Sequence, residues 1–175
     1  MTRLVPPWLQ TYSGQAFDIL APTTSTIRIE DIAHALSNLC RFAGHVRTFY
    51  SVGEHSVRAS HIPQSRDLQR AALMHDAAEA YIVDIPSPLK PLLTGYREIE
   101  QRIESVIAEK FGVNLGHPLI RDLDLIMLAT EKRDLMGPEA RPWGDLPDPL
   151  PEKIEPWTPI QAEQRFLLRF RELFE

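Results

Sequence analysis

The stretch of the chain that says most about its architecture comprises residues 67–90, DLQRAALMHDAAEAYIVDIPSPLK. Its small and aliphatic residues recur at the three- and four-residue spacing of a helix that buries one face, as Leu68, Ala71, Ala72, Ala78 and Ile82. Asp67 is a candidate N-cap, and the prolines at 86 and 88 end the helical pattern. We therefore expect a helix over most of 67–82 that packs through its apolar stripe.

Helical spacing also dominates the rest of the sequence. Apolar stripes predict helices over about 29–42, 96–111 and 120–136, a short helix behind the capping-box pair Ser51 and Glu54, and a last helix capped by Thr158. No series of residues alternates as strands would. We expect an all-α, compact helical bundle in one domain. It comprises an irregular N-terminal arm (1–26), a helical core (27–136), a Pro- and Trp-rich loop (137–157) and a C-terminal helix (158–175).

The composition is that of a packed globular domain in a reducing compartment. Hydrophobic residues make up 43% of the chain and charged residues 25%, which suits a single core. Cys40 is the single cysteine, so an intramolecular disulfide and a Cys-rich zinc site are excluded. No apolar run approaches the roughly 18 residues of a membrane span, and residues 1–10 lack the pattern of a signal peptide. We expect a cytoplasmic protein without membrane contact.

The charge of the chain restricts its partners. A formal net charge of −5 and a pI of about 5.7 argue against a broad surface for nucleic acid. A small phosphate ester remains compatible, because one or two local cations suffice to bind it. The loop at 137–157 holds six prolines and two tryptophans, which is too aromatic for a solvated linker. Trp143 and Trp157 are candidates for a lid or a subunit contact, and we expect a homo-oligomer.

Three polar residues interrupt the apolar face predicted within 67–90. On a helix, His75 and Glu79 lie one turn apart on the same side, and Asp76 adjoins them. Burying several carboxylates without a cation is costly or forces them to take up protons. A bound metal ion resolves this conflict, whereas a satisfied core histidine beside solvated acids is the alternative interpretation.

Two further polar residues break the core pattern elsewhere. His55 lies in the first turn behind the capping box, and Asp124 is flanked by leucines. Taken singly, each is more often structural. Together with His75 and Asp76 they supply two imidazoles and two carboxylates. This mixture suits one divalent ion such as Mn²⁺, Co²⁺, Fe²⁺, Ni²⁺ or Zn²⁺, and it leaves coordination positions for water and a substrate oxygen.

The order of these residues resembles that of the HD-domain metal-dependent phosphohydrolases, in which an early His precedes a His-Asp pair and a distant Asp follows. Here the order is His55, then His75 and Asp76, then Asp124. More narrowly, VGEHS at 52–56, HDAAE at 75–79 and DIPSPLK at 84–90 are similar to the branch of bacterial 5′-deoxyribonucleotidases and phage deoxynucleoside triphosphate (dATP) hydrolases. The resemblance covers about residues 29–136 and implies the helical fold and the metal site of that family.

The resemblance also implies roles for residues around the metal. Glu79 and Asp84 correspond to carboxylates that position or deprotonate the attacking water, with Glu79 as first choice for the base. Arg41 corresponds to a phosphate clamp, with Arg47 as a competing candidate. Lys90 matches the lysine that follows the Pro-x-Pro turn, where a cation would neutralise charge on the transferring group.

The predicted substrate is a nucleotide. Phe42 stands where the resembling proteins carry an aromatic near the nucleoside, although a core position is the alternative. The resemblance implies cleavage of a phosphate ester or anhydride, in first place as a 5′-deoxynucleotidase or dNTP phosphohydrolase. One alternative is a cyclic or signalling nucleotide; a two-metal version would need further histidines after His75 and Asp76, and only His117 follows them. Another is a non-catalytic helical metal-binding interaction module, in which changing Glu79 lowers stability rather than turnover.

Overall fold

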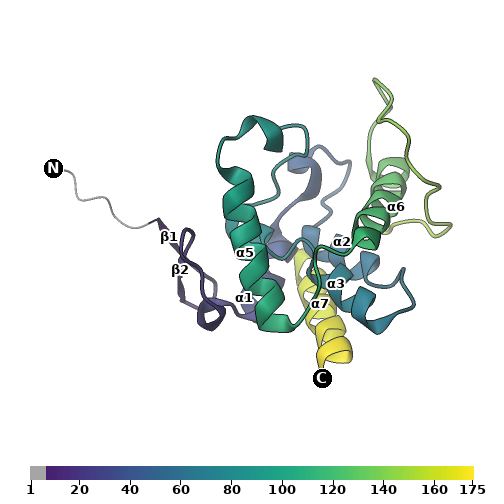
Figure 1. The fold of residues 1–175 in the computed structure, drawn as a ribbon. Helices are drawn as coiled ribbons and strands as arrows, with labels where there is room; N and C mark the ends of the chain where they lie inside the picture. Colours follow the sequence, from purple (N-terminus) through teal and green to yellow (C-terminus); the bar gives the residue numbers. More distant parts are fainter. Residues whose placement is uncertain (1–6) are drawn as a thin grey trace.

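A computed structural model of the protein describes residues 7–175, so the first six residues of the predicted arm lie outside the described part. The predicted all-α class is confirmed (Figure 1). The helices are α1 (Ile29–Asn38), α2 (Val52–Ala59), α3 (Arg66–Met74), α4 (Glu79–Ile82), α5 (Tyr96–Phe111), α6 (Pro118–Leu135) and α7 (Pro159–Phe174). None of the helices within 7–175 combines the length and the hydrophobicity that a membrane-spanning segment requires.

Helix α7 is central to the packing. It contacts α1, α2 and α3, and its inward stripe includes the fully buried side chain of Phe166. One core cluster joins these helices to α5 through Ile103 and Ile107. A second cluster, around Met127, joins α2 and α3 to α6. Each fully buried side chain of this size stabilises the fold by about 1.5–3 kcal/mol, so the site described below is built on well-packed elements.

The arm that precedes α1 contains a small hairpin. Strands β1 (Trp8–Gln10) and β2 (Ala16–Asp18) pair in antiparallel orientation, and a 3-10 turn η1 (Thr24–Thr26) follows. Phe17 of β2 is fully buried, and its ring stacks on that of Tyr81 in α4 at a centroid distance of 3.9 Å. The hairpin is therefore anchored to the helical bundle by one aromatic side chain.

The helix starts follow two of the three predicted capping residues. The Ser51 hydroxyl accepts a hydrogen bond from the Glu54 backbone N–H at 3.0 Å, and α2 begins there. Thr158 and Gln161 form a complete capping box at the start of α7. Asp67, predicted as a cap, instead lies in the first turn of α3, where its charge still complements the helix dipole.

The helix predicted over 67–82 is interrupted at His75. Helix α3 ends at Met74, and α4 begins only at Glu79. Between them each backbone hydrogen bond joins residues three positions apart, as in a 3-10 helix; for example, the Glu79 N–H donates to the carbonyl of Asp76 at 2.9 Å. A tighter turn of three residues aligns side chains three positions apart, so Asp76 and Glu79 share a side. The prediction of one continuous helix through His75 and Glu79 was therefore wrong.

The helix predicted over 29–42 also ends early. Helix α1 stops at Asn38, and Arg41–Gly44 forms a 3-10 turn, η2. Within η2, Phe42 and Ala43 have positive φ angles of 56° and 50°, which are costly for residues that carry a Cβ. The Arg41 backbone N–H donates to the carbonyl of Tyr50 at 2.9 Å. This bond ties the strained turn to the segment that leads into α2.

Candidate metal centre and the adjoining pocket

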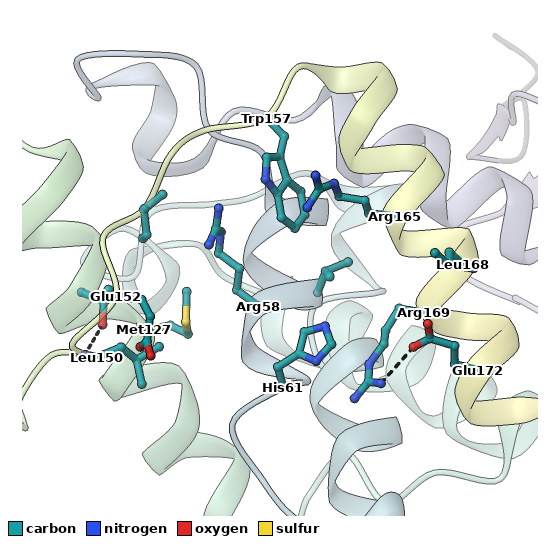
Figure 2. Close-up of a pocket in the computed structure, with 13 residues that line it drawn as sticks. Arg58, His61, Met127, Leu150, Glu152, Trp157, Arg165, Leu168, Arg169 and Glu172 are labelled. Carbon is teal, nitrogen blue, oxygen red and sulfur yellow. Dashed lines mark hydrogen bonds and ion pairs between the residues drawn. The ribbon is translucent and has the colours of Figure 1, made fainter.

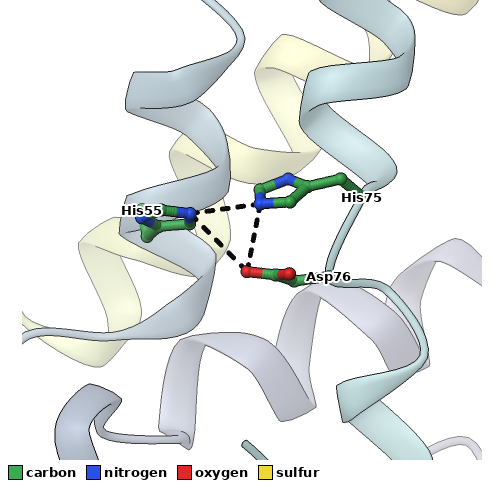
Figure 3. Close-up of side chains that lie close together, drawn as sticks. All are labelled: His55, His75 and Asp76. Carbon is green, nitrogen blue, oxygen red and sulfur yellow. Dashed lines mark hydrogen bonds and ion pairs between the residues drawn. The ribbon is translucent and has the colours of Figure 1, made fainter. Parts of the chain in front are cut away.

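Three predicted ligands converge at the junction of α2 and α3. His55 projects from α2, while His75 and Asp76 lie in the turn that follows α3 (Figure 3). Nε2 of His55 and Nε2 of His75 are 3.2 Å apart. Oδ2 of Asp76 lies 3.2 Å from the His75 Nε2 and 3.6 Å from the His55 Nε2. We call His55, His75 and Asp76 the donor cluster; one ligand atom from each lies within 4.8 Å of the others.

The Nδ1 atoms of both imidazoles are already engaged. His55 Nδ1 lies 2.6 Å from Oε1 of Glu131, and His75 Nδ1 lies 2.7 Å from the carbonyl oxygen of Ala72. Because carboxylate and carbonyl oxygens accept hydrogen bonds, we assign the proton of each neutral ring to Nδ1 and a lone pair to Nε2. Two lone pairs and a carboxylate oxygen that face one another repel unless a cation lies between them. The donor set therefore fits a divalent metal ion.

Asp124, the fourth predicted ligand, lies at the edge of the donor cluster. Its Oδ1 is 3.3 Å from the His55 Nε2, and its side chain is 43% exposed. It comes from the middle of α6. Asp124 is thus placed to complete a set of two imidazoles and two carboxylates from a third element of the fold.

Arg41 contacts the same carboxylates. One guanidinium nitrogen, Nη1, lies 3.4 Å from Oδ2 of Asp76, and the other, Nη2, lies 3.9 Å from Oδ1 of Asp124. Nη2 also lies 3.2 Å from Oε2 of Glu131. Three carboxylates and one guanidinium leave an excess of negative charge around the imidazoles, which a divalent cation is suited to offset.

Glu131 is a site residue that the sequence analysis missed. It is fully buried on α6, and it uses both of its oxygens: Oε1 for His55 and Oε2 for Arg41. Burial raises the pKa of Glu131, but the adjacent Arg41 and His55 outweigh this and hold it below the ordinary value. Glu131 lies seven residues, or two helical turns, after Asp124. That spacing was a signal in the sequence that both carboxylates share one face of α6.

Without an ion the same geometry favours a proton. Burial and the charge of Arg41 lower the pKa of His55, but the carboxylates of Glu131 and Asp124 together outweigh them and the pKa rises to about 10. Burial likewise lowers the pKa of His75, and the adjacent Asp76 raises it above its ordinary value. Asp76 itself is held far below its usual pKa by His75 despite its burial. A metal ion must therefore displace a proton from these rings.

Glu79 is buried one tight turn beyond Asp76. It is 6% exposed, and its Oε2 has no hydrogen-bond partner among the described residues. Burial, followed by the negative charges of Asp76 and Asp84, raises its pKa well above the ordinary value. A buried carboxyl group with an unpartnered oxygen and a raised pKa is suited to exchange a proton with a nearby water.

Asp84 and Lys90 occupy different surroundings. Burial raises the pKa of Asp84, and the preceding Val83 has a strained φ of 61°. Lys90, in the 3-10 turn η3 (Lys90–Leu92), points to carboxylates: its Nζ lies 2.8 Å from Glu100 and 3.8 Å from Glu79. Lys90 thus already has an acidic partner on α5. Its predicted contact with phosphate stays a prediction.

A pocket of about 510 Å³ adjoins the donor cluster. We call it the Arg41 pocket; its lining consists of Arg41, Phe42, Asp84, Pro86, Ser87, Pro88, Asp124, Leu128 and Trp143. Four residues selected from the sequence thus line one cavity: Arg41, Phe42, Asp84 and Asp124. Its volume is within the range of small-molecule sites, and its charged end borders the predicted metal ligands.

A second cavity, of about 640 Å³, lies between α2, α6 and α7 (Figure 2). It is larger than the Arg41 pocket, but its arginines already have partners within the protein. Arg58 and Arg169 pair with neighbouring glutamates at 2.8 and 3.1 Å. The guanidinium carbons of Arg58 and Arg165 lie 4.6 and 4.2 Å from the ring centroid of Trp157. Trp157 therefore packs between two cations. Because no residue of the donor cluster is in the described lining of this second cavity, we place the candidate site at the Arg41 pocket.

Two alternative site residues lie apart from the donor cluster. Arg47 is exposed, and the contact it makes through its backbone N–H is with the carbonyl of Leu135 at 3.0 Å. His117 is the N-cap of α6, where its Nδ1 accepts from the Leu119 backbone N–H at 3.2 Å. Arg41 is therefore the arginine beside the carboxylates, and the ring of His117 serves a helix end.

Comparison with known proteins places the chain in a family. No protein-family model matches the sequence. The chain is 44% identical over 174 residues to uncharacterized protein YfdR of Escherichia coli (strain K12), with 96% of both chains covered. It is 32% identical over 144 residues to uncharacterized protein RCAP_rcc00048 of Rhodobacter capsulatus, with 74% of both chains covered. At this identity and coverage, the chain belongs to the protein family that includes YfdR of Escherichia coli.

Proposed function

We propose that the protein is a divalent-metal-dependent phosphohydrolase that cleaves a phosphate ester or anhydride of a nucleotide, with deoxynucleotides as its preferred substrates. The observation that carries the proposal is the pair of Nε2 atoms 3.2 Å apart in the donor cluster. The Nδ1 bonds direct both lone pairs to one point beside Asp76, and Arg41 lies within 3.4 Å of that carboxylate.

The proposed chemistry is hydrolysis by an activated water. The donor cluster and Asp124 would hold a divalent ion, which would supply Lewis-acid activation of the water and of a phosphoryl oxygen. Glu79 would accept the proton of the attacking water, since its unpartnered oxygen is buried one tight turn beyond Asp76. This role needs the ionised carboxylate, which the charge of the ion would favour over the protonated form that burial and Asp76 favour in its absence. Asp84, which lines the Arg41 pocket, is the alternative acceptor.

Arg41 is the proposed phosphate clamp. Its guanidinium lies at the charged end of the Arg41 pocket, and it is held there by Glu131 at 3.2 Å. A substrate phosphate can replace the weaker contacts of Arg41 with Asp76 and Asp124, at 3.4 and 3.9 Å, without disturbing the bond to Glu131. A guanidinium fixed on one edge and available on the other is suited to bind a phosphoryl group in one orientation.

A phosphate-release screen tests the proposal. Deoxy- and ribonucleoside mono-, di- and triphosphates are each offered with Mn²⁺, Co²⁺, Ni²⁺, Zn²⁺ and Fe²⁺, and His75→Ala serves as the ligand-deficient control. We expect metal-dependent release that His75→Ala abolishes, with the highest kcat/KM on a deoxynucleotide. If the protein binds an ion and releases phosphate from none of the nucleotides, the phosphohydrolase proposal fails and a metal-binding interaction module becomes the better interpretation.

A further inference from the structure

The Arg41 pocket is lined by two chemically distinct sets of residues. Arg41, Asp84 and Asp124 are its charged lining residues, and Arg41 and Asp124 contact the donor cluster. The rest of its wall is apolar, with two aromatic rings, two prolines and a leucine, and Ser87 is its one neutral polar side chain within the described lining. With a divalent ion to offset the two carboxylates, such a lining suits an anionic group beside Arg41 and a flat, weakly polar group against the aromatic and proline side chains.

Trp143 contributes one of the aromatic rings. It comes from the Pro- and Trp-rich loop at 137–157, far in sequence from Phe42, yet the two ring centroids are 6.0 Å apart. The rings are tilted by 51°, so they do not cover each other's faces by stacking. Trp143 is 38% exposed, and an exposed indole beside an apolar pocket is available to a ligand.

The backbone of Trp143 is fixed to α6. Oε1 of Glu139 accepts from the Trp143 backbone N–H at 3.1 Å and from Lys132 Nζ at 2.7 Å. Lys132 Nζ also lies 5.7 Å from the centroid of the indole. On the other ring, the guanidinium carbon of Arg41 lies 5.3 Å from the centroid of Phe42. The two aromatic side chains are thus held at the pocket by polar contacts made by their neighbours.

We infer that Trp143 and Phe42 form an aromatic subsite that binds the base of the substrate, so that the loop at 137–157 is part of the binding site. The inference rests on the proposed function and extends it from the phosphate to the base. Trp143 is its new element, because the loop lies outside the segment on which the resemblance to phosphohydrolases depends. Stacking on an aromatic face accepts every base, and Ser87 offers little hydrogen bonding, so the subsite recognises the ring more than its identity.

The kinetic test compares substrates with and without a base. Trp143→Leu keeps an apolar side chain but removes the π-face, whereas Trp143→Phe keeps a smaller ring. With the metal-loaded enzyme, Trp143→Leu should lower kcat/KM for a deoxynucleoside monophosphate about 5- to 150-fold, the equivalent of one base–aromatic stack. The loss should appear mainly in KM, and Trp143→Phe should recover part of it. Hydrolysis of deoxyribose 5-phosphate, which has no base, should not change in either variant.

The controls are the other two tryptophans. Trp8 is 49% exposed on the hairpin, and Trp157 packs between Arg58 and Arg165. Trp8→Phe and Trp157→Phe should leave both activities at the parental level. Metal content and Tm, measured on the same preparations, show whether Trp143→Leu is folded. If it is folded and cleaves the nucleotide with parental KM, or if it loses both substrates equally, the inference is overturned while the proposed hydrolysis stands.

A binding measurement separates this inference from the proposed function. In the Trp8→Phe, Trp157→Phe background the tryptophan fluorescence, excited selectively over that of tyrosine, reports Trp143 alone. Deoxyadenosine, which has no phosphate to lose, should quench this fluorescence with saturation, whereas deoxyribose should not. Quenching by deoxyadenosine in a protein that hydrolyses no nucleotide supports the aromatic subsite and rejects the proposed reaction. Absence of quenching at millimolar deoxyadenosine and deoxyadenosine monophosphate rejects the subsite.

Discussion

Replacing Glu131 by glutamine removes one charge from the most buried contact of the candidate site and keeps the shape of the side chain. In the parent protein, Oε1 of Glu131 accepts from His55 Nδ1 at 2.6 Å, and its Oε2 accepts from Arg41 Nε at 3.2 Å. A carboxamide has one accepting oxygen and one NH₂ group, so it satisfies one of these donors and turns its own donor toward the other. Glu131→Gln therefore loosens either the metal ligand or the phosphate clamp.

The expected magnitude follows from the lost bond. A hydrogen bond to a charged group contributes about 1.5–3 kcal/mol. If the bond to His55 is lost, the ring is less well oriented and its Nε2 is a weaker ligand. Removing such a partner of a ligating histidine typically costs about 10- to 100-fold in metal affinity, which corresponds to about 1.4–2.7 kcal/mol. The two estimates agree, so we expect the Kd for the ion to rise about 10- to 100-fold.

The assay is calorimetric titration of the metal-free protein with Mn²⁺ and Zn²⁺, with chelator competition for the tighter ion. Asp122→Asn is the matched control, because Asp122 is an exposed carboxylate on the same helix. Circular dichroism shows whether the variant keeps its helices, and Tm is measured with and without ion, since an ion that binds the folded form alone raises Tm. A folded Glu131→Gln protein with the metal affinity and nucleotide KM of the parent would refute the reasoning.

Three further predictions concern the same site. Glu79→Gln should lower turnover about 10²- to 10⁴-fold at unchanged metal content and Tm, and parental turnover would transfer the role of base to Asp84. Arg41→Lys should lower kcat/KM by roughly 10- to 100-fold, because an ammonium cannot reproduce the fork of a guanidinium, while Arg47→Lys should not; equal effects of the two changes would exclude Arg41 as the clamp. The folded-state pKa of His55 is raised from 6.5 to about 10, so the stability it gives the metal-free protein is complete below pH 6.5 and is lost as the pH rises through about 10. Metal affinity should instead increase with pH over this window, since the ion displaces the proton; titrations in which affinity does not depend on pH would contradict this assignment.

The elements that the sequence predicted best are helices with one buried stripe and a recognisable end. Helix α5 ends at Gly112, which has a left-handed φ of 63°, and α7 starts at the capping box of Thr158. Such signals are local, because a cap or a left-handed residue acts on the backbone next to it. The order of the donor residues was also readable, and the structure brings His55, His75 and Asp76 together.

The interruption at His75 could not be read from spacing alone. The apolar stripe continues through the turn, and Ala77 and Ala78 are good helix formers. Both are buried, but of the two only Ala78 belongs to the predicted stripe. The backbone switches to three-residue bonds where the ring of His75 bonds the carbonyl of Ala72 at 2.7 Å. This change in the backbone depends on the His75 side chain, which must also face His55 of helix α2. The hairpin at 8–18 was not predicted for a different reason: strands of three residues are too short to show an alternating pattern in the sequence.

Glu131 was overlooked although its position carried a signal. It is followed by Lys132 and Arg133 near the end of α6, so its charge suggested an exposed face. Residues 120, 123 and 127 define a buried stripe, and the next position on that stripe is 131. A carboxylate on a buried stripe, two turns after Asp124, demands a cationic or donor partner. The partners, Arg41 and His55, come from segments whose proximity only the fold reveals.

The backbone itself points to the same site. Within residues 7–175, the non-glycine residues with a left-handed φ are Phe42, Ala43 and Val83. The first two follow Arg41 directly, and the third precedes Asp84, so all three adjoin residues that line the Arg41 pocket. Each such residue costs of order 1–3 kcal/mol and persists only where the surrounding structure over-determines it. Helix α1 stops at Asn38, and the strained turn that follows carries Arg41 to Glu131, to which it is bonded at 3.2 Å. The strain is therefore the conformational cost of bringing a guanidinium and an aromatic ring to one pocket beside the donor cluster.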